Sequence, residues 1–214
     1  MTSILDLLNS DMGRQLISGA SAQTGQSPDK TASVLSMALP TMLGAMQRNA
    51  ASPQGAESLN NALSDTRHDG SILSSLGGLL GGGSGDTSLI NEGAGILKHV
   101  LGGNQGRVEQ NISRNSGVDA GSVGKIIKMA APILMSVLGS QKRKGNVDQN
   151  GIGSLLGSVL GQNNSNNDQS LIETLLDADG DGSIIDDVAG MVLGSGKKKS
   201  GGLGGLLGGL FGGK

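Results

Sequence analysis

Apolar residues recur at helical spacing along almost the whole chain, and this periodicity constrains the fold more than any other feature of the sequence. The clearest stripe lies between Val123 and Leu138, where apolar residues three or four positions apart share one face of a helix. A second stripe runs from Val34 to Met46, and a third runs from Ile96 to Leu101 and ends at Gly102-Gly103. Alternation with a period of two, the mark of strands, is hard to find. The sequence therefore predicts an all-α protein, a multihelical array.

Two of these helices repeat one another. The segment Ser36–Leu43 aligns with Lys128–Met135 at a shift of 92 residues, so that Pro40 falls on Pro132. A proline inside a helix costs about 3 kcal/mol. Its presence at one register in both segments marks it as a feature of a repeated unit.

A second alignment extends the repeat and sets its limits. Leu59–Asp65 matches Leu171–Asp177 at a shift of 112 residues, because the second copy contains an inserted short helix and an Asn-rich loop. We therefore predict two tandem related helical units with flexible Gly-rich linkers. The predicted boundaries are an N-terminal unit at 1–82, a Gly-rich linker and connecting helix at 83–104, a second unit at 105–194, and a basic, Gly- and Leu-rich tail at 195–214.

An acidic loop in the second unit looks most like a binding site. A calcium loop of the EF-hand kind offers oxygen ligands at positions 1, 3, 5, 7 and 12 with a glycine at the sharp turn. Here the spacing fits the first four, but Val188 stands where the bidentate Glu should be, so we expect weak calcium binding, with a dissociation constant of about 10⁻⁴ M. The candidate metal ligands are Asp177, Asp179, Asp181, Ser183, Asp186 and Asp187.

The same residues also suit a turn that starts a helix without any metal. Asp, Gly and Ser favour turns and N-caps, and acidic side chains favour the first turn of a helix. In the first copy, Arg67 stands where Asp179 stands and His68 where Gly180 stands. That copy keeps the turn and loses the ligands, so both interpretations of the acidic loop stay open.

Five short segments, spread over nearly the whole chain, carry a family likeness: Ile4–Leu8, Ala38–Pro40, His68–Leu73, Ala130–Pro132 and Leu176–Ser183. On these residues the sequence resembles a bacterial family catalogued as domain of unknown function 937, related to the YidB-like proteins. The resemblance implies a multihelical array. It implies no established activity, substrate or cofactor.

The C-terminal tail combines charge with an apolar stripe. Lys197-Lys198-Lys199 precede leucines and Phe211 at helical spacing, so residues 197–214 could contact a membrane surface or a partner. Each glycine costs a helix about 1 kcal/mol relative to alanine. We therefore expect this tail to be disordered in isolation.

Nucleic acid is not an expected partner. The net charge is −2 and the chain contains one Phe and no Tyr or Trp, so stacking aromatics are missing. The basic cluster Lys142-Arg143-Lys144 follows a long helix, whose negative end explains it. With neither a secretory leader nor a run of about 18 apolar residues, we expect a cytoplasmic protein.

The sequence assembles no catalytic set. There are no cysteines and only two histidines: His68, in a turn without a neighbouring nucleophile, and His99, on a helix where we expect it to be exposed. We therefore predict a non-enzymatic interaction or structural module, with a candidate calcium loop, that binds another protein or a second copy of itself. The alternatives are a peripheral membrane protein anchored by its tail, and a metal-dependent hydrolase that uses the acidic loop.

Overall fold

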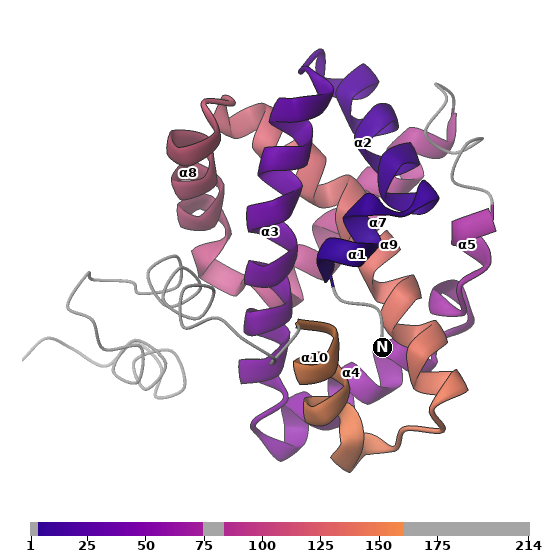
Figure 1. Cartoon of the computed structure of the whole chain (residues 1–214). Helices are drawn as coiled ribbons and strands as arrows, with labels where there is room; N and C mark the ends of the chain where they lie inside the picture. The colour runs from indigo at the N-terminus through magenta and orange to yellow at the C-terminus, as the bar shows by residue number, and fades with distance from the viewer. Residues whose placement is uncertain (1–3, 75–83, 161–214) are drawn as a thin grey trace, which may run out of the picture.

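A computed structural model describes residues 4–74 and 84–160, and within these ranges the regular secondary structure is entirely helical (Figure 1). This confirms the all-α prediction for the described part of the chain. The helices are α1 (Ile4–Asn9), α2 (Asp11–Thr24), α3 (Pro28–Asn49), α4 (Pro53–Ser64), α5 (Ser71–Ser74), α7 (Ser84–Val100), α8 (Gln105–Ser116), α9 (Ala120–Lys144) and α10 (Ile152–Leu160), with 3₁₀ turns η1 (Thr66–His68), η2 (Gly102–Asn104) and η3 (Gln149–Gly151).

Helix α9 is the centre of the fold. It packs against α2, α3, α4, α5, α7, α8 and α10, and nearly every residue from Val123 to Gly139 is buried. Figure 1 shows it running behind α3 through the middle of the molecule. Among the described helices, α9 is also the one long and apolar enough to cross a membrane, but 78% of its apolar stretch is buried inside the protein. Such burial is what a central core helix shows.

Helices α3 and α9 begin in the same way. Ser27 caps α3 by accepting a hydrogen bond from the Lys30 N–H, and Asp119 caps α9 by accepting one from the Ser122 N–H. The helix before each ends at a left-handed glycine, Gly25 with φ 67° and Gly117 with φ 66°. These are the pairs that a shift of 92 residues brings together.

Both long helices continue through an internal proline, Pro40 in α3 and Pro132 in α9. Tertiary packing outweighs the cost of the proline, because the residues around each one are among the most deeply buried in the protein. The proline register predicted from the repeat is therefore present in both helices.

One hydrophobic core joins the two predicted units. A single cluster extends from Leu16 to Val159 and is built from aliphatic residues and methionines. Burying one such Leu, Ile or Met side chain contributes about 1.5–3 kcal/mol. Because Leu35 and Met42 of α3 belong to the same cluster as Ile126 and Ile127 of α9, the packing of either unit depends on the other.

The predicted connecting helix begins earlier than expected. The apolar stripe indicated a helix from Ile96, and α7 starts at Ser84, with Leu89 and Leu97 buried against the core. The helix forms in spite of its glycines. One of them, Gly93, allows the backbone of α7 to approach α9 closely. The acidic loop and the tail lie outside the described residues, and the division of the chain at residues 82 and 105 stays a prediction.

Candidate functional site

The turn between α4 and α5, which the predicted repeat aligns with the acidic loop, lies within the described residues. Asp65 ends α4 and accepts a hydrogen bond from the Arg67 backbone N–H at 2.9 Å. The Arg67 side chain donates from Nε to Oδ1 at 3.1 Å and from Nη2 to Oδ2 at 2.8 Å. This bidentate partner holds the pKa of Asp65 well below its usual range. The turn thus contains its own cation.

The second half of the turn starts α5. Asp69 accepts a hydrogen bond from the Ser71 N–H at 2.7 Å, and hydrogen bonds from the Ser71 side chain and backbone lower the pKa of Asp69. Between them Gly70 has φ 96°, in the left-handed region that favours glycine. The turn and helix start predicted for this Asp-Gly-Ser segment are confirmed.

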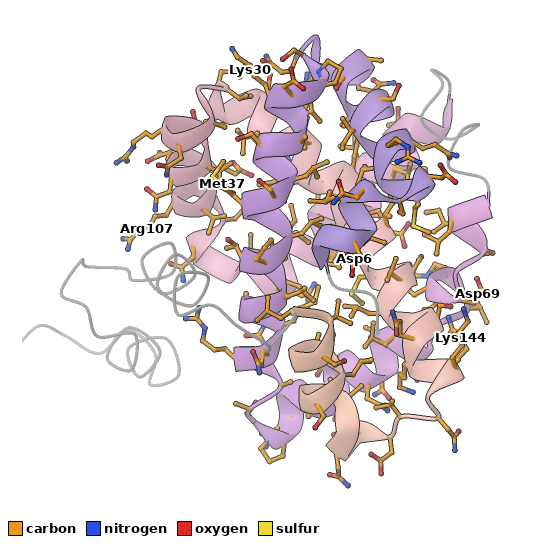
Figure 2. All side chains as sticks on the ribbon, viewed as in Figure 1. Asp6, Lys30, Met37, Asp69, Arg107 and Lys144 are labelled. Atoms are coloured by element: carbon orange, nitrogen blue, oxygen red, sulfur yellow. The ribbon has the colours of Figure 1, made fainter. Side chains whose placement is uncertain are left out.

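The basic cluster at the end of α9 fastens this turn from the other side. Lys142 Nζ donates to Ser64 Oγ at 2.9 Å, and Arg143 donates to the backbone oxygens of Leu63, at 3.2 Å, and of His68. Figure 2 shows Asp69 and Lys144 on the same side of the molecule, at this junction. Besides lying in the last turn of α9, as expected for basic residues, two members of the cluster therefore hold the α4–α5 turn.

His68 lies in this turn with its side chain 6% exposed. Its Nδ1 lies 2.8 Å from the backbone oxygen of Ala62, and its Nε2 lies 3.4 Å from Oε1 of Glu92 in α7. Neither Nε2 nor Oε1 has a hydrogen-bond partner, and both atoms are buried. No motif in the sequence around Glu92 indicates a functional role. The contact could not be predicted because it joins residues on two separate helical elements.

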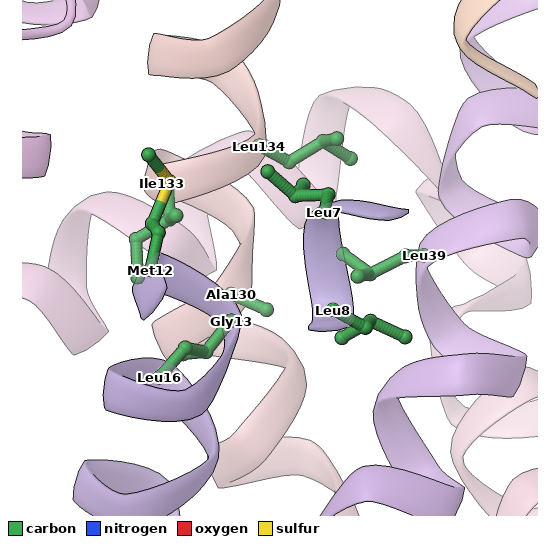
Figure 3. A pocket seen from close by; sticks show the side chains of 9 residues that line it. All are labelled: Leu7, Leu8, Met12, Gly13, Leu16, Leu39, Ala130, Ile133 and Leu134. Carbon is green, nitrogen blue, oxygen red and sulfur yellow. The ribbon is translucent and has the colours of Figure 1, made fainter. Parts of the chain in front are cut away.

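A small apolar cavity lies elsewhere, between α1, α2, α3 and α9 (Figure 3). Its volume is about 10 Å³, room for about one water molecule. Its walls carry no titratable side chain: Leu7, Leu8, Met12, Gly13, Leu16, Leu39, Ala130, Ile133 and Leu134.

The structure separates the remaining candidates. His99 is exposed, as predicted, with Nδ1 2.8 Å from the backbone oxygen of Gly95. Within residues 4–74 and 84–160, no three His, Asp or Glu side chains gather in a way that could hold a metal ion. The predicted calcium ligands lie outside the described residues: Asp177, Asp179, Asp181, Ser183, Asp186 and Asp187.

Comparison with known proteins gives one match. A family model described as "Bacterial protein of unknown function (DUF937)" matches residues 6–141. No curated protein and no solved structure matches the chain. The match covers each described helix from α2 to α8 and most of α9.

Proposed function

The chain belongs to the DUF937 family of bacterial proteins of unknown function, and from that premise we propose that it is a non-enzymatic interaction or structural module. One observation carries the proposal. Small-molecule sites usually enclose about 300–1,000 Å³, whereas the cavity described above offers about 10 Å³ between apolar side chains. In the most buried titratable pair, His68 lies in the turn that Arg143 fastens and Glu92 lies in α7, and neither residue lines that cavity.

The described part of the chain is suited to act as a platform. Where side-chain burial is described, the exposed residues are polar, charged or small, and the Leu, Ile, Val and Met side chains that are partly exposed pack against the core. Contact with a protein partner or a second copy would then use polar groups or the segments beyond residue 160. The tandem arrangement supports this, because matched caps and prolines in α3 and α9 are what a duplicated packing unit would show.

An assay for turnover tests the non-enzymatic assignment against the hydrolase alternative. The full chain is incubated with chromogenic carboxylic and phosphate esters in the presence of calcium or magnesium. We expect no release above that of heat-denatured protein. Turnover that disappears in Asp181→Ala, but persists in Asp69→Ala at the aligned position of the first copy, would establish the hydrolase instead. Sedimentation of the full chain over a range of concentrations tests self-association in the same samples.

We also propose weak calcium binding by the acidic loop, and the first-copy turn supplies the reason. In that turn the guanidinium of Arg67 neutralises Asp65. The shift of 112 residues places Asp177 on Asp65 and Asp179 on Arg67, so the second copy has a carboxylate where the first has a cation. Clustered carboxylates without a basic partner repel one another, and a bound divalent cation removes that repulsion.

The cation argument has its own test. Asp179→Arg restores in the second copy the residue that neutralises the first. We expect this variant to be more stable than the wild type without calcium and to gain nothing when calcium is added. If Asp179→Arg lowers calcium-free stability, carboxylate repulsion is not the property that distinguishes the two loops.

A further inference from the structure

The contacts of the His68 ring determine which of its two nitrogens donates a hydrogen bond. Its Nδ1 lies 2.8 Å from the Ala62 backbone oxygen, and a carbonyl oxygen can only accept. Nδ1 must therefore carry a hydrogen and donate it. In the neutral ring the other nitrogen, Nε2, is then an acceptor.

The atom that faces Nε2 is an acceptor as well. Glu92 Oε1 lies 3.4 Å away, and neither atom has another hydrogen-bond partner although both are buried. An ionised carboxylate only accepts. With a neutral ring, two buried acceptors would face each other unsatisfied, which is unfavourable, and one added proton converts the contact into a charge-assisted hydrogen bond.

We propose that His68 and Glu92 form a proton-operated latch between the α4–α5 turn and α7. One proton between Nε2 and Oε1 closes the latch, and loss of that proton opens it. The closed latch ties the turn that contains His68 to the middle of α7, which contains Glu92. Histidine suits this role because its charge changes between about pH 5 and 8.

The turn that holds His68 also contains the charged residues Asp65 and Arg67. These two pair with each other, and the guanidinium of Arg67 is also attracted to Glu92. A free imidazole binds a proton more readily than a free carboxylate does. The closed state is therefore an imidazolium–carboxylate pair.

The other charges nearby hold the turn in place rather than compete for the proton. From α9, Arg143 donates to the His68 backbone oxygen and acts on Asp69, while Lys142 binds Ser64. The backbone of His68 thus stays fixed to α9. Only the contact with α7 responds to the proton.

A double-mutant cycle on the full chain tests the latch. Urea unfolding is measured for the wild type, His68→Gln, Glu92→Gln and the double variant at pH 5.5 and 8.5. At pH 5.5 we expect a coupling of about tenfold in the unfolding equilibrium constant, typical of a hydrogen bond between charged groups. At pH 8.5 we expect the favourable coupling to vanish.

The single variant Glu92→Gln gives a second readout, which does not need His68→Gln to fold. A Gln amide can donate to the neutral ring, as a carboxylate cannot. Glu92→Gln should therefore be less stable than the wild type at pH 5.5 and at least as stable at pH 8.5. Glu109→Gln is the matched control, since Glu109 is half-buried and bonds to Gln105 at 2.8 Å. We expect it to show no reversal with pH.

His99→Gln is the control for the histidine. Its Nδ1 also lies 2.8 Å from a backbone oxygen, but the side chain is exposed. A coupling of equal size at both pH values would overturn the latch, as would a Glu92→Gln effect that does not change with pH. A coupling that disappears on addition of EDTA would show that a metal ion, and not a proton, joins the two side chains, and it would overturn the proposal. None of these outcomes depends on calcium binding at the acidic loop or on the interaction-module assignment.

Discussion

Gly93 of α7 lies against the backbone carbonyl oxygen of Lys128 in α9, so closely that a Cβ atom at residue 93 would overlap it. Two helices that cross on a glycine can bring their backbones together, because no side chain separates them. Gly95, two residues further along α7, has nothing within 4 Å of the place a Cβ would take. The same helix therefore contains one glycine required by packing and one that is not.

This pair gives a matched test of the packing between α7 and α9. Gly93→Ala should lower the free energy of unfolding by about 1–3 kcal/mol, because the obstacle is backbone and must move. Gly95→Ala should raise it by about 0.5–1 kcal/mol through helix propensity. Urea denaturation measures both. Equal effects of the two substitutions would show that α7 does not pack on α9 at Gly93.

Arg143 should stabilise the α4–α5 turn more than its neighbour does. Both residues are exposed, but the Arg143 guanidinium donates to the backbone oxygens of Leu63 and His68, whereas Lys144 makes no such contact with the described residues. We expect Arg143→Gln to cost about 1.5–3 kcal/mol, the usual worth of hydrogen bonds to a charged group. Lys144→Gln should change stability by less than about 0.5 kcal/mol. Thermal denaturation at neutral pH compares the two variants. A similar loss of stability in both would show that the Arg143 hydrogen bonds do not stabilise the turn.

Asp65 should contribute to the acid sensitivity of the protein. Because Arg67 lowers its pKa in the folded state, the charged form adds stability above the unfolded value of about 3.9, and that stability is lost as the pH falls through the folded-state pKa. Asp65→Asn should therefore weaken the loss of stability on acidification below about pH 4. Melting temperatures recorded against pH measure the slope. Arg67→Gln removes the guanidinium but keeps the backbone hydrogen bond to Asp65, so it should weaken the slope less than Asp65→Asn does. An unchanged slope in Arg67→Gln would contradict the assignment.

Calcium should stabilise the full chain through the second copy alone. At about 1 mM calcium and a dissociation constant of about 10⁻⁴ M, binding to the native state adds about 1.4 kcal/mol. A calcium titration followed by thermal unfolding measures this. The shift should vanish in Asp181→Ala and persist in Asp69→Ala, which changes the aligned residue of the first copy. The absence of a shift in the wild type at 1 mM would refute the calcium proposal.

The C-terminal tail makes a separate prediction about membranes. If residues 197–214 contact a lipid surface, the full chain should float with anionic liposomes and a 1–196 truncation should stay at the bottom of the gradient. Electrostatic attraction by the lysines should make flotation weaker at high salt. Flotation of the truncation as well would locate the contact elsewhere.

The sequence by itself determined the ends of several described helices. Ser27, Asp119, Gly25 and Gly117 act through groups within a few residues of their own positions, so the ends of α2, α3, α8 and α9 could be predicted from short segments. The all-α fold followed from periodicity, which needs only local sequence. The Asp-Gly-Ser turn before α5 was predicted for the same reason.

Tertiary structure alone decided which distant residues meet. Nothing near Glu92 indicates that it faces His68, and nothing near Arg143 indicates that it binds the backbone of residues 63 and 68. These contacts depend on how α7 and α9 pack. That packing depends on the close approach of the two backbones at Gly93, which the spacing of apolar residues does not predict. Local chemistry fixes helices and caps, whereas the charged contacts between them come from the shared core that sets one helix against another.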